Sequence, residues 1–196
     1  MVDLYCLAQT TVDALKMSKL TVVTAESLTG GLIAATLVDI PGASEVIRGG
    51  FVTYQTEMKT ALLDIDPEII KHFNVVSAKV AIEMAQSAQK KSGADIGVSA
   101  TGLAGPGGGT DEIPVGTVYV GIATRKYAYA LPLHLNGERY EIRHTTVART
   151  IQLLLREALN IYGSIEEIPN KEDKEGSDVG NEQREIPGNL PRAYSS

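Results

Sequence analysis

Hydrophobic and polar residues recur along the first half of the chain in patterns that predict alternating helices and strands. Apolar residues at helical spacing predict an opening helix from Leu4 to Met17. A β-branched run predicts a buried strand over Leu20–Ala25, and the apolar stretch 32–39 predicts a buried helix. Strand character returns over 46–54 and again over Ile96–Ser99.

Capping residues and glycines add clear start and stop signals for helices. Asp66 before Pro67 predicts one helix start, and Ser77 predicts the start of an amphipathic helix that runs to about Lys91 and ends at Gly93. Two alternating runs, 116–124 and 127–135, predict a β-hairpin, and 139–162 predicts the longest helix. We therefore expect an α/β fold, a single three-layer α/β/α sandwich domain with a central mixed sheet.

This pattern stops at Gly163, which suggests a boundary between two parts of the chain. We expect residues 1–163 to form the domain and residues 164–196 to form an acidic, disordered tail. From Ser164 onward the chain has eight acidic and four basic residues and almost no aliphatic run. Such a segment buries too little apolar surface to offset the entropy lost on ordering.

Charge and composition narrow the classes of partner. The net charge of −6 argues against nucleic acid as the main partner, because nucleic-acid-binding surfaces are basic. No apolar run reaches the ~20 residues that span a bilayer, so we expect no membrane association. The single cysteine, Cys6, excludes an intramolecular disulfide and fits a cytoplasmic location.

Three polar, glycine-rich or hydroxyl-rich segments each follow a predicted strand. They are Thr24–Gly31, Thr53–Lys59 and Ser99–Thr110. Ligands in open α/β sheets bind beyond the carboxyl ends of the strands. We therefore expect these segments to meet at one pocket, although they lie far apart in the chain.

The first segment offers a hydroxyl nucleophile, Ser27, where a strand turns into a helix. Backbone amides at such a start lack partners and suit an oxyanion or a phosphate. The amides expected to be unpaired are those of Leu28, Thr29, Gly30 and Gly31. The alternative is a capping serine in a tight turn. The segment is not the Gly-x-Ser-x-Gly elbow of α/β-hydrolases, so any base must come from elsewhere.

Lys59 is the candidate base, because burial lowers the pKa of a lysine and serine–lysine pairs can replace serine–histidine pairs. Tyr54 could relay a proton or hold the lysine. Alternatively, Lys59 is a solvated helix residue and Tyr54 an edge aromatic.

The third segment has a backbone that could wrap a ligand, with Thr101 as its best polar contact. Its glycines are Gly102, Gly105, Gly107, Gly108 and Gly109. They match neither the dinucleotide fingerprint nor the P-loop. A plain flexible connector is the alternative.

Metal and cofactor chemistry have little support in the sequence. His72, His134 and His144 are scattered without ligand spacing, so we expect no metal and no cofactor. Arg139 and Arg143 stand one helical turn apart and could hold a phosphate or carboxylate as planar forks. A solvated helix face is the alternative for both.

Taken together and in this order, the segments resemble the carboxy-terminal domain of the competence/damage-inducible CinA proteins. The resemblance covers about residues 4–162. The stretches that carry it are 25–31, 52–59, 99–108, 114–119 and 137–139. The family includes nicotinamide-nucleotide amidohydrolases, which convert nicotinamide mononucleotide to nicotinic acid mononucleotide and ammonia in pyridine-nucleotide recycling.

The resemblance implies that Ser27 is the nucleophile, Lys59 the base and Tyr54 its helper, with a small-molecule nucleotide as substrate. It also implies a homo-oligomer that needs no metal. From the segments and the resemblance together, we expect the substrate to contact Thr29, Gly30, Gly31, Thr101, Gly102, Gly105, Gly107, Arg139 and Arg143.

Two departures from the family pattern lie near the proposed pocket. Leu28 stands where the family often has cysteine, and Gln55-Thr56 replaces the commoner Ser-Asn. Neither removes a proposed catalytic group. Two other functions stay open: a non-catalytic nucleotide-binding module of the same fold, and an amidase for another nucleotide or small amide.

Overall fold

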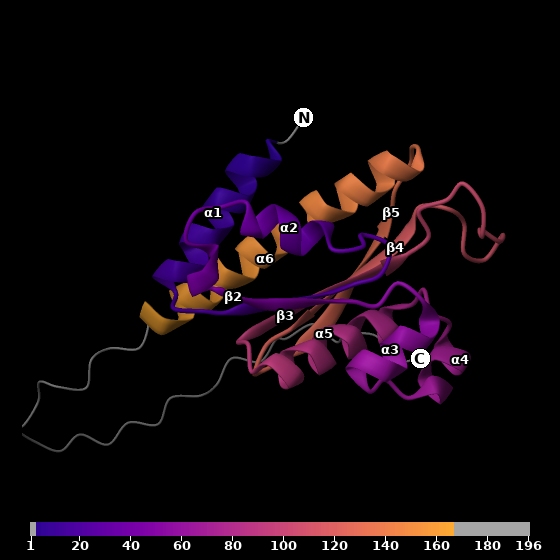
Figure 1. Ribbon diagram of the computed structural model, residues 1–196, viewed down its shortest axis with the longest axis horizontal. Coiled ribbons are helices and arrows are strands. Elements are labelled where there is room, and N and C mark those ends of the chain that lie inside the picture. The colour runs from indigo at the N-terminus through magenta and orange to yellow at the C-terminus, as the bar shows by residue number, and fades with distance from the viewer. Residues whose placement is uncertain (1–2, 167–196) are drawn as a thin grey trace, which may run out of the picture.

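The computed structural model describes residues 3–166 and shows a five-stranded sheet between two layers of helices (Figure 1). The strand order is β2-β1-β3-β4-β5, with β1 parallel to β2 and β3, and the remaining pairs antiparallel. The strands are β1 Val22–Glu26, β2 Ile47–Val52, β3 Ile96–Gly102, β4 Thr117–Ala123 and β5 Ala128–His134. This arrangement confirms the predicted three-layer fold with a mixed sheet.

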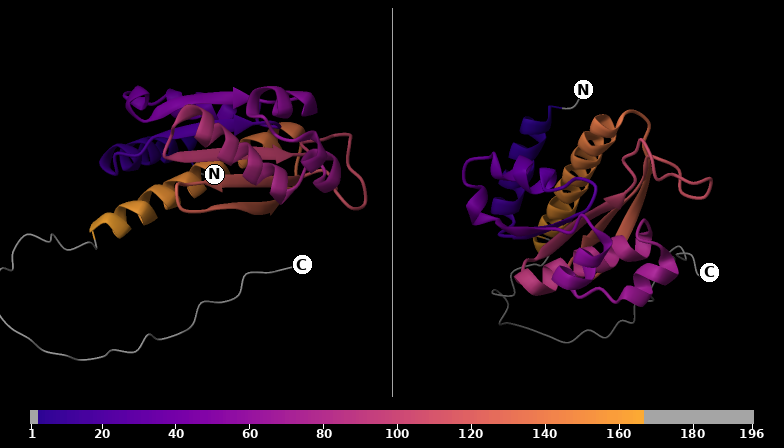
Figure 2. Two further views of the ribbon diagram at one scale, coloured as in Figure 1. Left: turned by 90° about the horizontal axis from the view of Figure 1, so that it is seen from below. Right: turned by 45° about the vertical axis from the view of Figure 1, so that its right-hand side comes forward.

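Two groups of helices cover the two faces of the sheet (Figures 1 and 2). One face carries α1 Leu4–Met17, α2 Leu32–Val38 and α6 Arg139–Glu166. The other carries α3 Thr56–Leu63, α4 Pro67–Phe73 and α5 Ala78–Ser92, and a short 3-10 turn, η1 Ala43–Glu45, precedes β2. Two separate hydrophobic clusters follow, because alternate residues of each strand face opposite sides.

The helix starts are fixed by the side chains that the sequence indicated. The Asp66 carboxylate accepts a hydrogen bond from the amide of Glu68, and the Ser77 hydroxyl accepts one from the amide of Val80. Gly93 ends α5 in the left-handed conformation. Each cap satisfies amides or carbonyls that a helix leaves unpaired at its ends.

Small residues let α5 lie directly on β3 and β4. A Cβ atom at Gly97 would collide with the carbonyl oxygen of Ala85, and one at Gly121 would collide with that of Ala81. Between them, the Ser99 hydroxyl donates to the Ala81 carbonyl at 2.6 Å. This close packing sets the position of the chain just before α5, which forms one wall of the site.

Two element ends differ from the sequence prediction. β3 continues to Gly102 rather than ending at Ser99, because β1 pairs with it as far as Ala100 and β4 as far as Gly102. Thr101 therefore lies inside a strand and not directly after one. α6 runs through Gly163 to Glu166, past the predicted boundary. The predicted disorder of 167–196 falls outside the described residues and stays a prediction.

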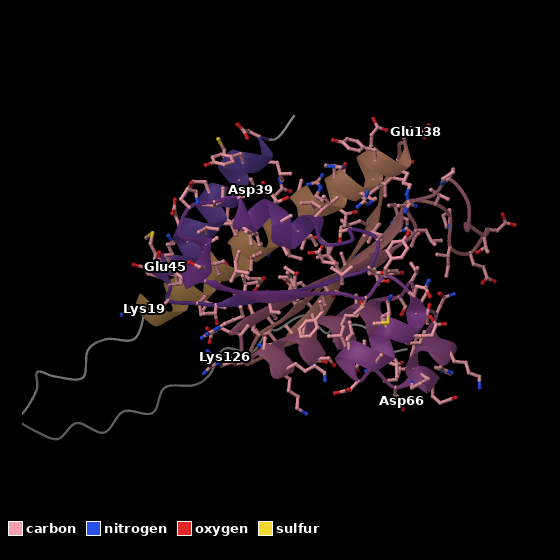
Figure 3. All side chains as sticks on the ribbon, in the orientation of Figure 1. Lys19, Asp39, Glu45, Asp66, Lys126 and Glu138 are labelled. Atoms are coloured by element: carbon pink, nitrogen blue, oxygen red, sulfur yellow. The ribbon has the colours of Figure 1, made fainter. Side chains whose placement is uncertain are left out.

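With Glu26, Lys59 and Glu157 as buried exceptions, most charged side chains lie around the outside of the domain. Figure 3 shows this for Lys19, Asp39, Glu45, Asp66, Lys126 and Glu138. Within residues 3–166, no helix combines the length and the apolar character that crossing a membrane requires.

Candidate active site

The segments that follow β1, β2 and β3 meet at one end of the sheet, as expected for three parallel strands (Figure 1). They surround a cavity of about 240 Å³. Its lining consists of Ser27, Leu28, Tyr54, Thr56, Lys59, Val75, Val76, Thr101, Gly102, Leu103, Ala104, Gly105, Gly107 and Arg139. The predicted nucleophile, base and helper thus line one cavity.

Ser27 is held at the rim of this cavity by the backbone of the sheet. Its amide donates to the carbonyl of Ala100 at 2.9 Å, which extends the pairing of β1 with β3 by one residue. On the other side of β1, the amide of Thr53 donates to the carbonyl of Glu26 at 2.8 Å. Ser27 therefore continues an ordered strand, and the residue is 9% exposed.

Lys59 reaches Ser27 from α3. Its ammonium nitrogen Nζ lies 3.1 Å from Ser27 Oγ and 2.7 Å from the carbonyl oxygen of Thr53. Lys59 is 1% exposed, and none of the ion pairs formed among residues 3–166 includes it. The structure therefore places this lysine in the interior and not on a solvated helix face.

Lys59 is buried and has no carboxylate as a hydrogen-bond partner among the described residues, so its amine loses a proton more easily than that of an exposed lysine. Desolvation disfavours the charged form and lowers the pKa of Lys59 to about 8, although the negative charge of Glu57 acts in the opposite direction. A neutral amine has one lone pair and two hydrogens. With one hydrogen directed at the carbonyl of Thr53, the lone pair can accept the proton of Ser27.

Arg139, in the first turn of α6, connects the second and third segments. Its guanidinium donates to the hydroxyl of Tyr54 at 2.8 Å and to the carbonyl of Gly105 at 2.7 Å. Tyr54 is 56% exposed and lines the cavity with its hydroxyl fixed by this contact. Because the Tyr54 oxygen accepts this hydrogen bond, the Tyr54 proton points away from Arg139.

The third segment is held in place where it leaves β3 and is exposed further along. Thr101 is buried, and its hydroxyl donates to the carbonyl of Val75 at 2.8 Å, which joins β3 to the chain before α5. Gly105 adopts a φ of 72°, and a Cβ there would lie 2.6 Å from Cγ1 of Val115. Only glycine suits this position. Gly107 lines the cavity and has open space around it.

One expectation about the first segment is wrong. The amide of Gly30 donates to the carbonyl of Ser27 at 3.1 Å, and that of Gly31 donates to Glu26 Oε2 at 2.9 Å. These two amides are paired and not free for a ligand. Among residues 3–166, the amides of Leu28 and Thr29 have no acceptor.

Glu26 is a site residue that the sequence reasoning missed. It is completely buried, and its carboxylate accepts from the amides of Gly31, Ile33 and Ala34 at 2.9–3.0 Å. The hydroxyl of Thr24 donates to it at 3.1 Å. A carboxylate directly before a helix start was the available signal, since carboxylates are stabilised at helix N-termini.

Arg143 and three other predicted contact residues do not line the cavity. The Arg143 guanidinium donates to the carbonyls of Leu28 and Thr29, at 2.9 Å in each case. The other three are Thr29, Gly30 and Gly31. Their contact with substrate stays a prediction.

Comparison with known proteins places the chain in a family. Residues 5–158 match the CinA C-terminal domain. The chain belongs to the CinA C-terminal domain family. Among solved structures, the competence/damage inducible protein CihA from Agrobacterium tumefaciens is 37% identical with a TM-score of 0.77, covering 80% of this chain and 96% of that one. A CinA superfamily protein from Klebsiella pneumoniae is 27% identical with a TM-score of 0.78, covering 81% and 99%.

Curated relatives in the family are longer than the matched region. A CinA-like protein from Dictyoglomus thermophilum is 44% identical over 155 residues, which are 79% of this chain and 38% of that protein. A putative competence-damage inducible protein from Clostridium novyi is 44% identical over 142 residues, or 72% of this chain and 34% of that protein. The chain therefore spans about a third of the length of these curated relatives.

Proposed function

We propose that this CinA-family domain is an amidohydrolase that cleaves the carboxamide of nicotinamide mononucleotide to give nicotinic acid mononucleotide and ammonia. The observation that carries the proposal is the buried pair of Ser27 and Lys59, whose reactive atoms lie 3.1 Å apart. A lysine whose pKa is lowered to about 8 is partly neutral near neutral pH and is suited to act as a base.

The reaction divides into two half-reactions. Ser27 Oγ attacks the carboxamide carbon while its proton passes to Nζ of Lys59. The carbon–nitrogen bond then breaks, Lys59 returns the proton to the departing nitrogen, and ammonia leaves an ester on Ser27. Water attacks this ester, Lys59 takes a proton from the water, and that proton restores the Ser27 hydroxyl as the carboxylic acid leaves.

The negative charge that forms on the carboxamide oxygen needs hydrogen-bond donors. The amides of Leu28 and Thr29 directly follow the nucleophile and lack acceptors among the described residues. We assign them this role, because backbone amides next to a nucleophile commonly stabilise an oxyanion. Removing one such donor costs on the order of 100-fold in rate in enzymes that depend on them.

The remainder of the cavity suits the nucleotide part of the substrate. Lys59 and Arg139 are the basic residues of its lining, and Lys59 is engaged with Ser27. Arg139 is therefore the group assigned to the phosphate, helped by the exposed backbone around Gly107. Within residues 3–166, no group of three or more histidine, cysteine or acidic side chains has the arrangement of a metal site.

The test is a product analysis with the purified chain. We expect nicotinamide mononucleotide to yield ammonia and nicotinic acid mononucleotide in equal amounts, and free nicotinamide to react much more slowly because it lacks the phosphate. Binding of the nucleotide without ammonia release would identify a non-catalytic binding module. Faster release from another amide would identify a different amidase.

A further inference from the structure

The turn that carries Ser27 is held from two sides by charged side chains that lie outside the cavity lining. Glu26 binds three backbone amides at 2.9–3.0 Å, and Arg143 binds two backbone carbonyls at 2.9 Å. We propose that Glu26 and Arg143 form a clamp that positions the turn from Ser27 to Ala34 for catalysis. This inference rests on the proposed function and adds two positioning residues to it.

Glu26 supplies the acceptor half of the clamp. Its Oε2 accepts from Gly31 and Ile33, and its Oε1 accepts from Ala34 and from the hydroxyl of Thr24. Four donors therefore converge on one buried carboxylate. Hydrogen bonds to an ionised acceptor are shorter and stronger than neutral ones, so this contact fixes the start of α2 relative to β1.

Arg143 supplies the donor half of the clamp. Its Nε binds the carbonyl of Leu28, and its Nη2 binds the carbonyl of Thr29. A peptide carbonyl and the amide of the next residue point in opposite directions because the peptide unit is planar. Holding the Leu28 carbonyl on Arg143 therefore directs the Thr29 amide away from Arg143.

The two halves act on neighbouring peptide units and leave one part of the turn unpaired. Glu26 uses the amides from Gly31 onward, and Arg143 uses the carbonyls of Leu28 and Thr29. The amides of Leu28 and Thr29 are the donors assigned to the oxyanion. The clamp thus fixes the direction of the Thr29 amide without lining the cavity, while the Leu28 amide is oriented by the Ser27 carbonyl, which accepts from the amide of Gly30.

Arg143 stands one turn of α6 after Arg139, and the two arginines reach all three segments. Arg139 binds the second and third segments through Tyr54 and Gly105, and Arg143 binds the first through Leu28. The start of α6 therefore joins the parts of the pocket to each other. A misplacement of about 1 Å in such a constellation can cost on the order of 100-fold in rate.

Glu26→Gln tests the acceptor half with little change in shape. A glutamine side chain retains one of the two acceptor oxygens. Its NH2 group replaces the other oxygen and faces two of the four hydrogen-bond donors that the carboxylate binds. The matched control is Glu157→Gln, since Glu157 of α6 is also buried and accepts from two hydroxyls, those of Tyr127, just before β5, and Tyr129, in β5. Arg143→Ala tests the donor half, with Arg149→Ala on the exposed face of the same helix as its control.

The first readout is amide hydrogen exchange, which does not depend on any activity. We expect exchange in a peptide covering residues 27–38 to rise at least 10-fold in Glu26→Gln and in Arg143→Ala. The Glu157→Gln and Arg149→Ala proteins should keep wild-type exchange there. Unchanged exchange in both clamp variants would overturn the clamp whether or not the protein is an enzyme.

The second readout is steady-state kinetics with nicotinamide mononucleotide. We expect each clamp variant to lose about 100-fold in kcat, with KM within about threefold of wild type and an unchanged pH midpoint, because Lys59 is untouched. Guanidinium ion, but not the same concentration of ammonium, should restore part of kcat to Arg143→Ala. A large rise in KM with kcat unchanged would instead identify Arg143 as a substrate ligand.

The two readouts separate the two proposals. If exchange rises as expected but wild-type protein releases no ammonia, the clamp stands and the amidohydrolase function fails. If ammonia is released and both clamp variants retain full kcat, the function stands and the catalytic role of the clamp fails.

Discussion

Two parts of the pocket wall, the turn from Ser27 to Ala34 and the glycine-rich loop from Leu103 to Gly116, are built in opposite ways. The turn is held by a buried carboxylate and a guanidinium and continues a strand of the sheet. The loop is tied at its base, where the amide of Gly116 donates to the carbonyl of Leu103 at 2.8 Å, and residues 106–112 are exposed.

This difference separates two tasks of an active site. Bond making needs a nucleophile, a base and oxyanion donors in fixed positions, because reaction rates fall steeply with misplacement. Binding of a flexible nucleotide tolerates a pocket wall that changes its conformation. Under the proposed function, the turn suits the first task, and the loop, with Gly107 in open space, suits the second.

Replacing Lys59, the proposed base beside the turn, should lower the rate far more than any change in the loop. Lys59→Met keeps most of the side-chain volume but removes the proton acceptor of Ser27. We expect kcat to fall by about 10²–10⁴-fold, the usual contribution of general-base catalysis. Steady-state ammonia release measures this change, and circular dichroism confirms the fold. Retention of more than a tenth of kcat would exclude Lys59 as the base.

The protonation of Lys59 should appear in the pH dependence of the rate. The base must be neutral, and burial lowers the pKa of Lys59 to about 8. We therefore expect kcat/KM to rise with pH and to level off above about 8, with a tenfold loss per unit below that value. A rate that is independent of pH between 6 and 9 would contradict this assignment.

The same pKa shift should appear in stability. Because the pKa is lower in the folded protein than the usual 10.5, the unfolded protein binds more protons between about pH 8 and 10.5, and stability rises with pH there. Relative to Lys59→Met, wild-type protein should gain about 3 kcal/mol of unfolding free energy across this window. Urea denaturation of both proteins at pH 7.5 and 10.5 measures the gain, and an equal difference at both pH values would show that Lys59 is not desolvated.

Two glycines of the loop should respond differently to alanine, with smaller effects. Gly105→Ala meets the side chain of Val115 at a left-handed backbone and should destabilise the protein by about 1–3 kcal/mol. It should also raise KM, since the Gly105 carbonyl holds Arg139. Gly107→Ala should change stability by less than about 0.5 kcal/mol. Thermal melts and KM values compare the two variants. Equal changes in stability and KM would show that the chain at Gly105 is no more constrained than the chain at Gly107.

The sequence predicts the elements well because their signals are local. Caps at Asp66 and Ser77 and the alternating pattern of the hairpin act within a few residues. The extension of β3 to Gly102 was missed because it depends on pairing with β1 and β4. The continuation of α6 through Gly163 was missed because a single glycine does not stop a long helix.

The site was predicted as a set of residue types, and its internal contacts were not. The order of the three segments predicted that Ser27, Tyr54 and Lys59 would share a pocket, and they do. The role of Arg143 depends on hydrogen bonds to backbone atoms more than 100 residues away in the chain. Such contacts leave no local pattern, so an arginine that binds the protein cannot be distinguished in the sequence from one that binds a ligand.

The most direct test of the account is ammonia release from nicotinamide mononucleotide by wild-type protein and Ser27→Ala, measured side by side at pH 8. Removing one hydroxyl should leave the fold and nucleotide affinity unchanged and lower kcat by at least about 1,000-fold, because Ser27 forms the covalent intermediate. Full turnover by Ser27→Ala, with the wild-type product, would contradict the central claim that Ser27 is the nucleophile.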